Sequence, residues 1–202
     1  MTDILPGKPR RLVVGMSGAT GAPIAIRMLR VLAQIEVETH LIMSRMAEVT
    51  LAHESSLKVA EVRALAHVAY RNDDLAAAPS SGSFRTMGMV VVPCSMRALG
   101  EMAVGGGGSL LTRAADVTLK ERRRLVVVAR ETPLTLAHLR AMTAVTEMGG
   151  IIAPPVPAFY FGPQSIDEMV DHMVGRVLDL FDLDHNLVKR WGEQGGSGPQ
   201  PR

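Results

Sequence analysis

The sequence predicts a single domain of the α/β class with a doubly wound, mostly parallel sheet. Short runs of Val, Leu and Ile alternate with segments whose apolar residues recur at helical spacing. Of the 202 residues, 47% are hydrophobic and only 3% are aromatic, as expected for buried parallel strands under helices. Several runs stop abruptly at short polar groups. In such a sheet these stops lie at the carboxyl ends of strands, where ligands bind.

The first third of the chain begins the alternation. The predicted elements are a strand at 12–16, a glycine-rich turn at 17–21, a helix at 22–34, a strand at 37–43 and a helix at 44–55. Residues 57–78 have a mixed pattern, and only a turn at 72–74 is predicted there.

The alternation resumes after this stretch. The predicted elements are a strand at 87–92, a helix at 96–102, a flexible four-glycine segment at 105–108, a helix at 110–122, a strand at 125–128, a helix at 134–148, a strand at 151–153 and a helix at 166–181. The prolines among residues 154–157 exclude regular structure, because proline lacks an amide donor and fixes φ. We expect a flexible arm at 1–10, the domain at 11–191 and a disordered tail at 192–202.

Composition and charge argue against several function classes. The net charge is +2, and Cys94 is the single cysteine, which excludes an internal disulfide and suits a reducing compartment. No apolar stretch approaches the ~20 residues of a membrane span, and the first residues lack a signal-peptide core, so we expect a cytoplasmic protein. The arginines at 122–124 lack interleaved aromatic residues, and we interpret them as a helix C-terminus rather than a nucleic-acid site.

Two predicted strand ends carry polar groups suited to chemistry. The glycine-rich turn holds Ser17 and Thr20, whose hydroxyls suit a phosphate or a flavin, helped by the N-terminus of the next helix. After the strand at 125–128, Arg130 and Glu131 stand side by side, a cation beside a proton carrier. Alternatively, the glycine-rich turn is a plain β–α turn without a ligand, and Glu131 is a carboxylate at the N-terminus of the next helix.

Other strand ends add weaker candidates. Ser44 and Ser95 stand at the start of predicted helices. Each could cap its helix, contact a ligand, or do both. Cys94 has no partner cysteine, and we interpret it as a small buried residue rather than a nucleophile.

Some candidates lie on the predicted helices. Arg113, Asp116 and Lys120 share a helix face, either as a surface ladder of ion pairs or as ligand contacts. Tyr160 and Arg176 could together hold a phosphate or be structural. The histidines show no ligand spacing, so no metal site is predicted.

Four segments carry a resemblance to a known family. GMSGATG, VVPCSMR, LLTRAADVTLKERRRLVVVARETPL and PPVPAFYF, in this order, closely resemble the UbiX/Pad family of flavin prenyltransferases, over about residues 10–191. The resemblance implies a flavodoxin-like, Rossmann-type sheet, FMN binding and a homododecamer. It implies an enzyme that joins a dimethylallyl group from dimethylallyl monophosphate to N5 and C6 of reduced FMN without a metal. The prenylated FMN would serve a UbiD-type decarboxylase.

The resemblance also assigns roles to residues of this chain. It places FMN beside Gly18, Ala19, Thr20, Ser44, Ser95, Met96, Arg97, Ala98 and Arg130. It places the prenyl phosphate beside Arg113, Lys120, Tyr160 and Arg176. It gives catalytic roles to Glu131, Lys120, Thr20 and Glu54. Glu131 would exchange a proton with the phosphate or the flavin, and Thr20 and Glu54 would relay protons at the flavin.

The chain departs from the family at a few positions. Thr20 replaces a common serine but keeps the hydroxyl, and residues 105–108 replace a more polar loop, so loop order or prenyl specificity could differ. Phe84 either covers the prenyl pocket or packs in the core.

Two other functions are weighed against the prenyltransferase. An FMN-dependent cysteine decarboxylase would need a catalytic histidine, for which His53 is the candidate, and an asparagine motif that we do not find. A non-catalytic FMN carrier or decarboxylase-associated subunit would have lost Lys120, Glu131, Tyr160 and Arg176, all of which are present.

Overall fold

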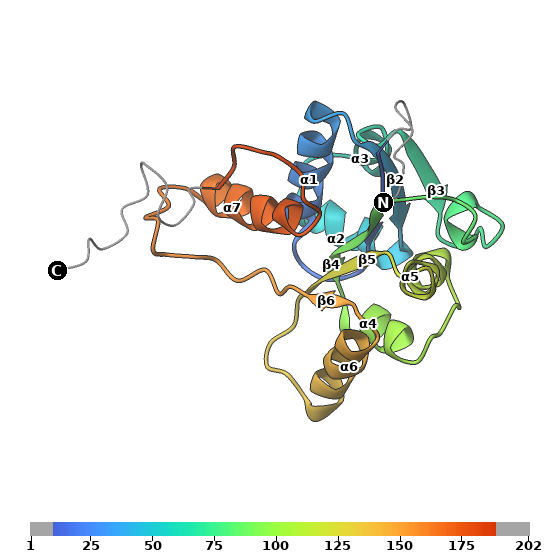
Figure 1. Cartoon of the computed structure of the whole chain (residues 1–202). Helices are drawn as coiled ribbons and strands as arrows, with labels where there is room; N and C mark the ends of the chain where they lie inside the picture. Colours follow the sequence, from blue (N-terminus) through green and yellow to red (C-terminus); the bar gives the residue numbers. More distant parts are fainter. Residues whose placement is uncertain (1–9, 189–202) are drawn as a thin grey trace.

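The computed structural model describes residues 10–188 and confirms the predicted α/β class (Figure 1). Its elements in chain order are β1 (Arg11–Met16), α1 (Ala22–Gln34), β2 (Glu38–Met43), α2 (Arg45–Glu54), α3 (Val59–Arg63), β3 (Val68–Arg71), the 3₁₀ helix η1 (Ala78–Ser80), β4 (Gly88–Cys94), α4 (Met96–Ala103), α5 (Leu110–Lys120), β5 (Arg124–Ala129), α6 (Leu136–Glu147), β6 (Ile151–Ile152) and α7 (Ile166–Asp179). The predicted arm, apart from Arg10, and the predicted tail lie outside the described residues.

The six strands form one parallel sheet in the order β3-β2-β1-β4-β5-β6. Without the edge strand β3, this is the flavodoxin-like order that the resemblance implied. The order reverses between β1 and β4, which pair directly, with Leu12 opposite Gly88. At such a reversal the loops leave the sheet in opposite directions and open a crevice at the carboxyl ends of the strands.

The two faces of the sheet bury separate apolar cores. Val14 and Val90 point toward α1, α2, α3 and α7, whereas Val13 and Met89 point toward α4, α5 and α6. Successive side chains of a strand point to opposite faces, so strands covered on both sides are apolar throughout. In Figure 1, α7 lies beside α1 and α4 beside α6, on opposite sides of the strands.

The buried strands agree closely with the prediction, but several boundaries differ, among them the ends of β4 and α5. β4 continues through Pro93 and Cys94, two residues beyond the expected end of the strand at residue 92. The helix expected at 110–122 ends at Lys120, because the amides of Arg122 and Arg123 bond back to the carbonyls of Leu119 and Thr118, both at 2.9 Å. The basic cluster therefore follows the helix C-terminus, and Arg124 opens β5.

The sequence pattern does not predict α3 and β3. All four residues of β3 are at least partly exposed, so this edge strand has no buried apolar run. α3 has five residues, which is too short for a helical period to be recognised. Within residues 10–188, no helix combines the length and apolar character needed to cross a membrane.

Candidate functional site

The crevice between β1 and β4 contains a cavity of about 500 Å³, within the usual range for small-molecule sites. Five of the nine predicted flavin contacts line it, namely Gly18, Ser44, Ser95, Arg97 and Ala98. Segments separated by as many as 80 residues thus meet in one hollow. The wall also contains Ser17, a candidate from the glycine-rich turn, and Gly108 of the four-glycine segment. Further lining residues were not predicted: Arg45, Met46, Asn72, Glu101, Ser109, Leu111 and Thr112. Ser109 could have been found, because it follows the glycine run as an N-cap residue.

Ser17 holds the two central loops together. Its hydroxyl donates to the Pro93 carbonyl at 3.1 Å and accepts from the Ser95 amide at 2.7 Å. Its own amide donates to the same Pro93 carbonyl at 3.1 Å. The Ser17 proton is therefore used inside the protein, contrary to the expectation that this hydroxyl donates to a ligand.

Two helices, α2 and α4, present open N-termini at this cavity. Ser44 caps α2 by accepting from the Ala47 amide at 3.1 Å, and Ser95 caps α4 by accepting from the Ala98 amide at 3.4 Å. The first two amides of a helix have no partner inside it. Within residues 10–188, no hydrogen bond uses the amides of residues 45, 46, 96 and 97. These four donors suit an anion.

The N-termini of α1 and α5 are closed instead. Glu54, at the end of α2, accepts from the amides of Gly21 and Ala22, both at 2.8 Å. Asn72 accepts from the Leu110 amide through its carbonyl at 2.8 Å and from the Leu111 amide through Oδ1 at 3.0 Å. The expectation that the N-terminus of the helix after the glycine turn serves a phosphate is therefore wrong, because a carboxylate already occupies it.

Gly18 is fixed by its neighbour on α2. A Cβ at this position would lie 2.3 Å from Cβ of Met46, so no larger residue fits without moving the start of α2. Gly21, at the end of the same turn, has φ of +124°, which favours glycine. The turn sequence therefore secures close packing against the open helix.

Cys94 is the small buried residue that was predicted. It is fully buried at the end of β4, and burial raises the pKa of its thiol to about 12. A thiol with this pKa is protonated at neutral pH and is a poor nucleophile.

The other predicted flavin contacts lie around the cavity rather than in its wall. Ala19 and Thr20 belong to the Ser17–Gly21 turn, and Thr20 is exposed. The Met96 side chain packs on the core beneath α4. Arg130 follows β5, and its amide donates to the Cys94 carbonyl at 3.0 Å, which places it beside the start of α4.

Arg130 and Glu131 are both exposed. Within residues 10–188, neither forms an ion pair, and a Glu131 oxygen accepts from the Thr132 amide at 3.0 Å. The two charges are thus accessible to a ligand at the carboxyl end of β5.

A second, smaller cavity of about 280 Å³ lies beside α7, with Arg176 in its wall and Tyr160 outside the wall, in contact with His172. Arg176 lines it together with apolar residues of α1 and of the proline-rich segment, and its guanidinium donates to Asp179 at 2.7 Å. The Tyr160 hydroxyl lies 3.5 Å from Nε2 of His172, which also lines this cavity. An apolar cavity with a cation in its wall and a hydroxyl next to a lining residue suits a small apolar phosphate ester.

Arg113 and Lys120 lie at different ends of α5. Arg113 pairs with Asp116 at 2.7 Å, near the cavity end of the helix. Lys120 pairs with Glu121 rather than Asp116, so the ladder of ion pairs is incomplete. At ~1.5 Å of rise per residue, Lys120 is roughly 16 Å along the helix from Ser109. Lys120 therefore does not reach the cavity between β1 and β4 of the same chain.

Phe84 packs against His40 edge-on, with ring centroids 4.9 Å apart, and under the Arg11 guanidinium at 5.1 Å. His40 is buried and is hydrogen-bonded to Glu38 and Tyr70, both at 2.9 Å. Phe84 is partly exposed and belongs to neither apolar core, and its role as a cover of the prenyl pocket stays a prediction.

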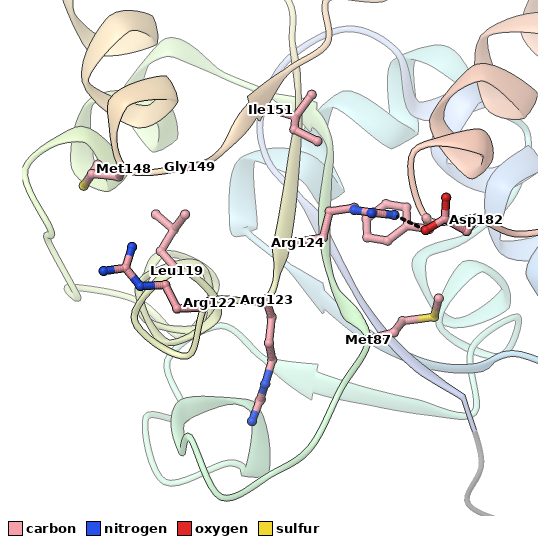
Figure 2. Close-up of a pocket in the computed structure, with 10 residues that line it drawn as sticks. Met87, Leu119, Arg122, Arg123, Arg124, Met148, Gly149, Ile151 and Asp182 are labelled. Carbon is pink, nitrogen blue, oxygen red and sulfur yellow. Dashed lines mark hydrogen bonds and ion pairs between the residues drawn. The ribbon is translucent and has the colours of Figure 1, made fainter. Parts of the chain in front are cut away.

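A further cavity lies at the opposite edge of the sheet, where β4, β5 and β6 begin (Figure 2). Arg122, Arg123 and Arg124 line it, but Figure 2 shows their guanidinium groups pointing in three directions. Arg123 donates to the carbonyls of Gly82 and Phe84, and Arg124 pairs with Asp182. The arginines do not converge on one anion. Residues 10–188 also contain no group of three or more His, Cys, Asp and Glu side chains that could hold a metal ion.

Comparisons with known proteins agree on one family. The Flavoprotein family model matches residues 6–178. The flavin prenyltransferase UbiX of Escherichia coli (strain K12) is 51% identical over 90% of this chain and 98% of its own length. A structure of AnUbiX (PadA1) in complex with FMN and dimethylallyl pyrophosphate superposes with a TM-score of 0.90 at 53% identity, covering 91% of this chain and 98% of that one. A dodecameric FMN-dependent UbiX-like decarboxylase from E. coli O157:H7 has a TM-score of 0.88 at 48% identity, over 90% and 98% of the two chains.

Proposed function

Because this chain belongs to the UbiX family of flavin prenyltransferases, we propose that it transfers a dimethylallyl group from dimethylallyl monophosphate to reduced FMN and releases prenylated FMN. One observation carries the proposal: flavin contacts predicted in three separate segments of the chain line a single cavity at the switch point of the sheet. When bound, reduced FMN supplies the N5 and C6 positions that accept the prenyl group.

The cavity has the donor set that FMN requires. Its phosphate would meet the open amides of α2 and α4, together with the Ser44 and Ser95 hydroxyls and the Arg97 guanidinium. Arg97 is mostly exposed and, among residues 10–188, pairs only with Glu101, so it can turn toward an anion. Gly18 and Ala98 leave room for the isoalloxazine ring, which Arg130 would border.

The prenyl phosphate would be held beside the smaller cavity. Tyr160 and Arg176 supply a hydroxyl and a cation there, and the apolar wall would receive the dimethylallyl group. Clustered cations stabilise the charge that develops on the departing phosphate. Glu131 would exchange a proton with this phosphate or with C6 of the flavin, and Thr20 and Glu54 would relay protons. Glu54 would do so while it holds the start of α1.

Lys120, and with it part of the phosphate site, would come from a neighbouring copy. Lys120 is partly exposed at the far end of α5, and a similar chain forms a dodecamer. We infer that this chain also assembles into a dodecamer, so that the α5 of one protomer completes the site of the next. Arg113 would contribute from the same helix.

The expected substrate and partner follow from this chemistry. Dimethylallyl monophosphate is the proposed donor, although the solved relative contains dimethylallyl pyrophosphate. The product would pass to a UbiD-type decarboxylase, and we propose the cytoplasm, where a lone buried thiol such as Cys94 stays reduced, as the site of both reactions. The test of this step is activation of a cofactor-free UbiD-type decarboxylase by the released flavin.

The decisive experiment is an anaerobic incubation of the protein with reduced FMN and either phosphate ester, without added metal. Mass spectrometry of the released flavin should show a gain of one dimethylallyl group. Glu131→Gln should slow this turnover and leave FMN binding intact, whereas Glu147→Gln, at the end of α6, should have no effect. Unmodified flavin with both esters would contradict the proposal and favour the FMN carrier.

The alternative function of a cysteine decarboxylase has no such support. The solved cysteine decarboxylase TvaF has 18% identity and a TM-score of 0.60, a likeness that shows the shared fold alone.

A further inference from the structure

His172 occupies an unusual position for a polar residue of α7. Only 7% of its surface is exposed, and its side chain lines the smaller cavity together with Arg176. The ring stacks on Phe161, with centroids 4.6 Å apart and planes at 14°. It meets Tyr160 edge-on, at 6.1 Å and 84°. The Tyr160 hydroxyl lies 3.5 Å from Nε2.

Burial also determines the charge of this imidazole. Burial lowers the pKa of His172, and the nearby Arg176 charge lowers this pKa further, while Asp179 acts in the opposite direction. The ring is therefore neutral at neutral pH, with one nitrogen that donates and one that accepts. If Nε2 carries the proton, it donates to the phenol oxygen, and the Tyr160 proton is then directed elsewhere.

The tautomer thus determines what Tyr160 can do. A phenol that donates to Nε2 has no proton left for a ligand, whereas a phenol that accepts from Nε2 can donate outward. Stacking on Phe161 fixes the imidazole plane, so the hydroxyl has a defined partner direction. Arg176 lies one helical turn after His172 and faces the same cavity.

We propose that His172 is a positioning residue that donates from Nε2 to the Tyr160 hydroxyl and so directs the Tyr160 proton toward the phosphate of the prenyl donor. This inference rests on the proposed function, because it assigns Tyr160 and Arg176 to the phosphate ester. The bound dianion favours the tautomer with the proton on Nε2, since only then does Tyr160 donate to it. His172 acts on the phosphate through Tyr160 rather than by donating to it directly.

The test is a double-mutant cycle between His172 and Tyr160, with three measured quantities. They are the dissociation constant of dimethylallyl monophosphate for protein loaded with oxidised FMN, the anaerobic kcat and KM, and the dissociation constant of FMN. His172→Phe keeps an aromatic ring on Phe161 and removes the hydrogen bond. His172→Gln restores an amide donor. His138→Phe, on α6, is the matched control.

We expect His172→Phe to weaken binding of the monophosphate by about twofold to tenfold, the range for one neutral hydrogen bond. It should raise KM by a similar factor and leave FMN affinity unchanged. In a Tyr160→Phe background the same change should have no further effect, and His172→Gln should recover most of the loss. His138→Phe should behave as the wild type.

Two results would overturn the inference while the proposed function stands. They are a loss of the same size in the Tyr160→Phe background, and a parallel loss of FMN affinity, which would mark His172 as merely structural. A wild type that binds the ester but does not prenylate would overturn the proposed function alone, and the binding cycle would still decide the role of His172. A wild type that does not bind the ester would overturn both.

Discussion

Four helix N-termini meet around the crevice between β1 and β4, and they form two contrasting pairs. Those of α2 and α4 face the cavity, and their first amides have no hydrogen-bond partner within the described part of the chain. Those of α1 and α5 are closed by Glu54 and Asn72. All four begin after a small residue at the same edge of the sheet. Whether such an end is left open therefore depends on what distant residue reaches it, and not on the local turn.

The largest effect should come from opening a closed end. Glu54→Ala leaves the amides of Gly21 and Ala22 without their carboxylate partner, and hydrogen bonds to charged groups contribute about 1.5–3 kcal/mol each. We expect the free energy of unfolding to fall by about 2–4 kcal/mol in chemical denaturation. Glu54→Gln keeps an acceptor and should lose about half as much. Equal stability of Glu54→Ala and the wild type would show that α1 needs no closure.

The converse change places a charge at an open end. Ser44→Asp keeps an N-cap acceptor for α2, so stability should be retained. At about 5 Å and an effective dielectric constant of about 20, two like charges repel by about 3 kcal/mol. FMN affinity, measured by fluorescence quenching, should therefore fall at least about tenfold. Thr135→Asp, which alters the cap of α6 away from the cavity, is the control and should bind FMN normally. Unchanged affinity in Ser44→Asp would mean that the flavin phosphate does not lie at α2.

A smaller effect is expected at the second closed end. Asn72→Ala removes the Oδ1 acceptor of the Leu111 amide but leaves the backbone carbonyl that accepts from Leu110. Removing one such cap lowers the free energy of unfolding by about 1 kcal/mol. Thermal unfolding should report this loss, and Asn72→Asp should avoid it. A loss as large as that of Glu54→Ala would show that the two closures are equivalent after all.

The smallest effect tests how far an open end reaches. Cys94 lies two residues before α4, and a helix N-terminus usually lowers the pKa of a nearby thiol. Here the effect of burial is larger than that of the helix, and it raises the pKa of Cys94 to about 12. We therefore expect essentially no alkylation by iodoacetamide at pH 8 in the native protein and complete alkylation in denaturant. Rapid native modification would mean that α4 acts on the thiol as well as on the cavity.

The buried strands and the position of the ligand edge could be predicted from the sequence. Continuous apolar runs predicted β1, β4 and β5 to within two residues, because strands buried on both faces need such runs. The ligand edge followed from the topology, since the loops after β1 and β4 must meet at the reversal of strand order.

Long-range side-chain contacts were not predictable. Glu54 reaches Gly21 from 33 residues away, and no local pattern marks it as the closure of α1. The Ser17 hydroxyl is used by a loop 76 residues later. The edge strand β3 is exposed and has no apolar run. The assignments of Lys120, Glu131, Tyr160 and Arg176 remain predictions that the enzyme assays will decide.

The hydrogen bonds of Ser17 also determine when the site can form as the protein is made. The bonds join the end of β1 to Pro93 and Ser95, more than 75 residues later, so the cavity has no second wall until β4 has been synthesised and has paired with β1. Contacts of such long sequence separation form late, because the chain between them must first lose its freedom. A nascent chain that ends before β4 therefore has no flavin site, and capture of flavin marks the completion of the central sheet.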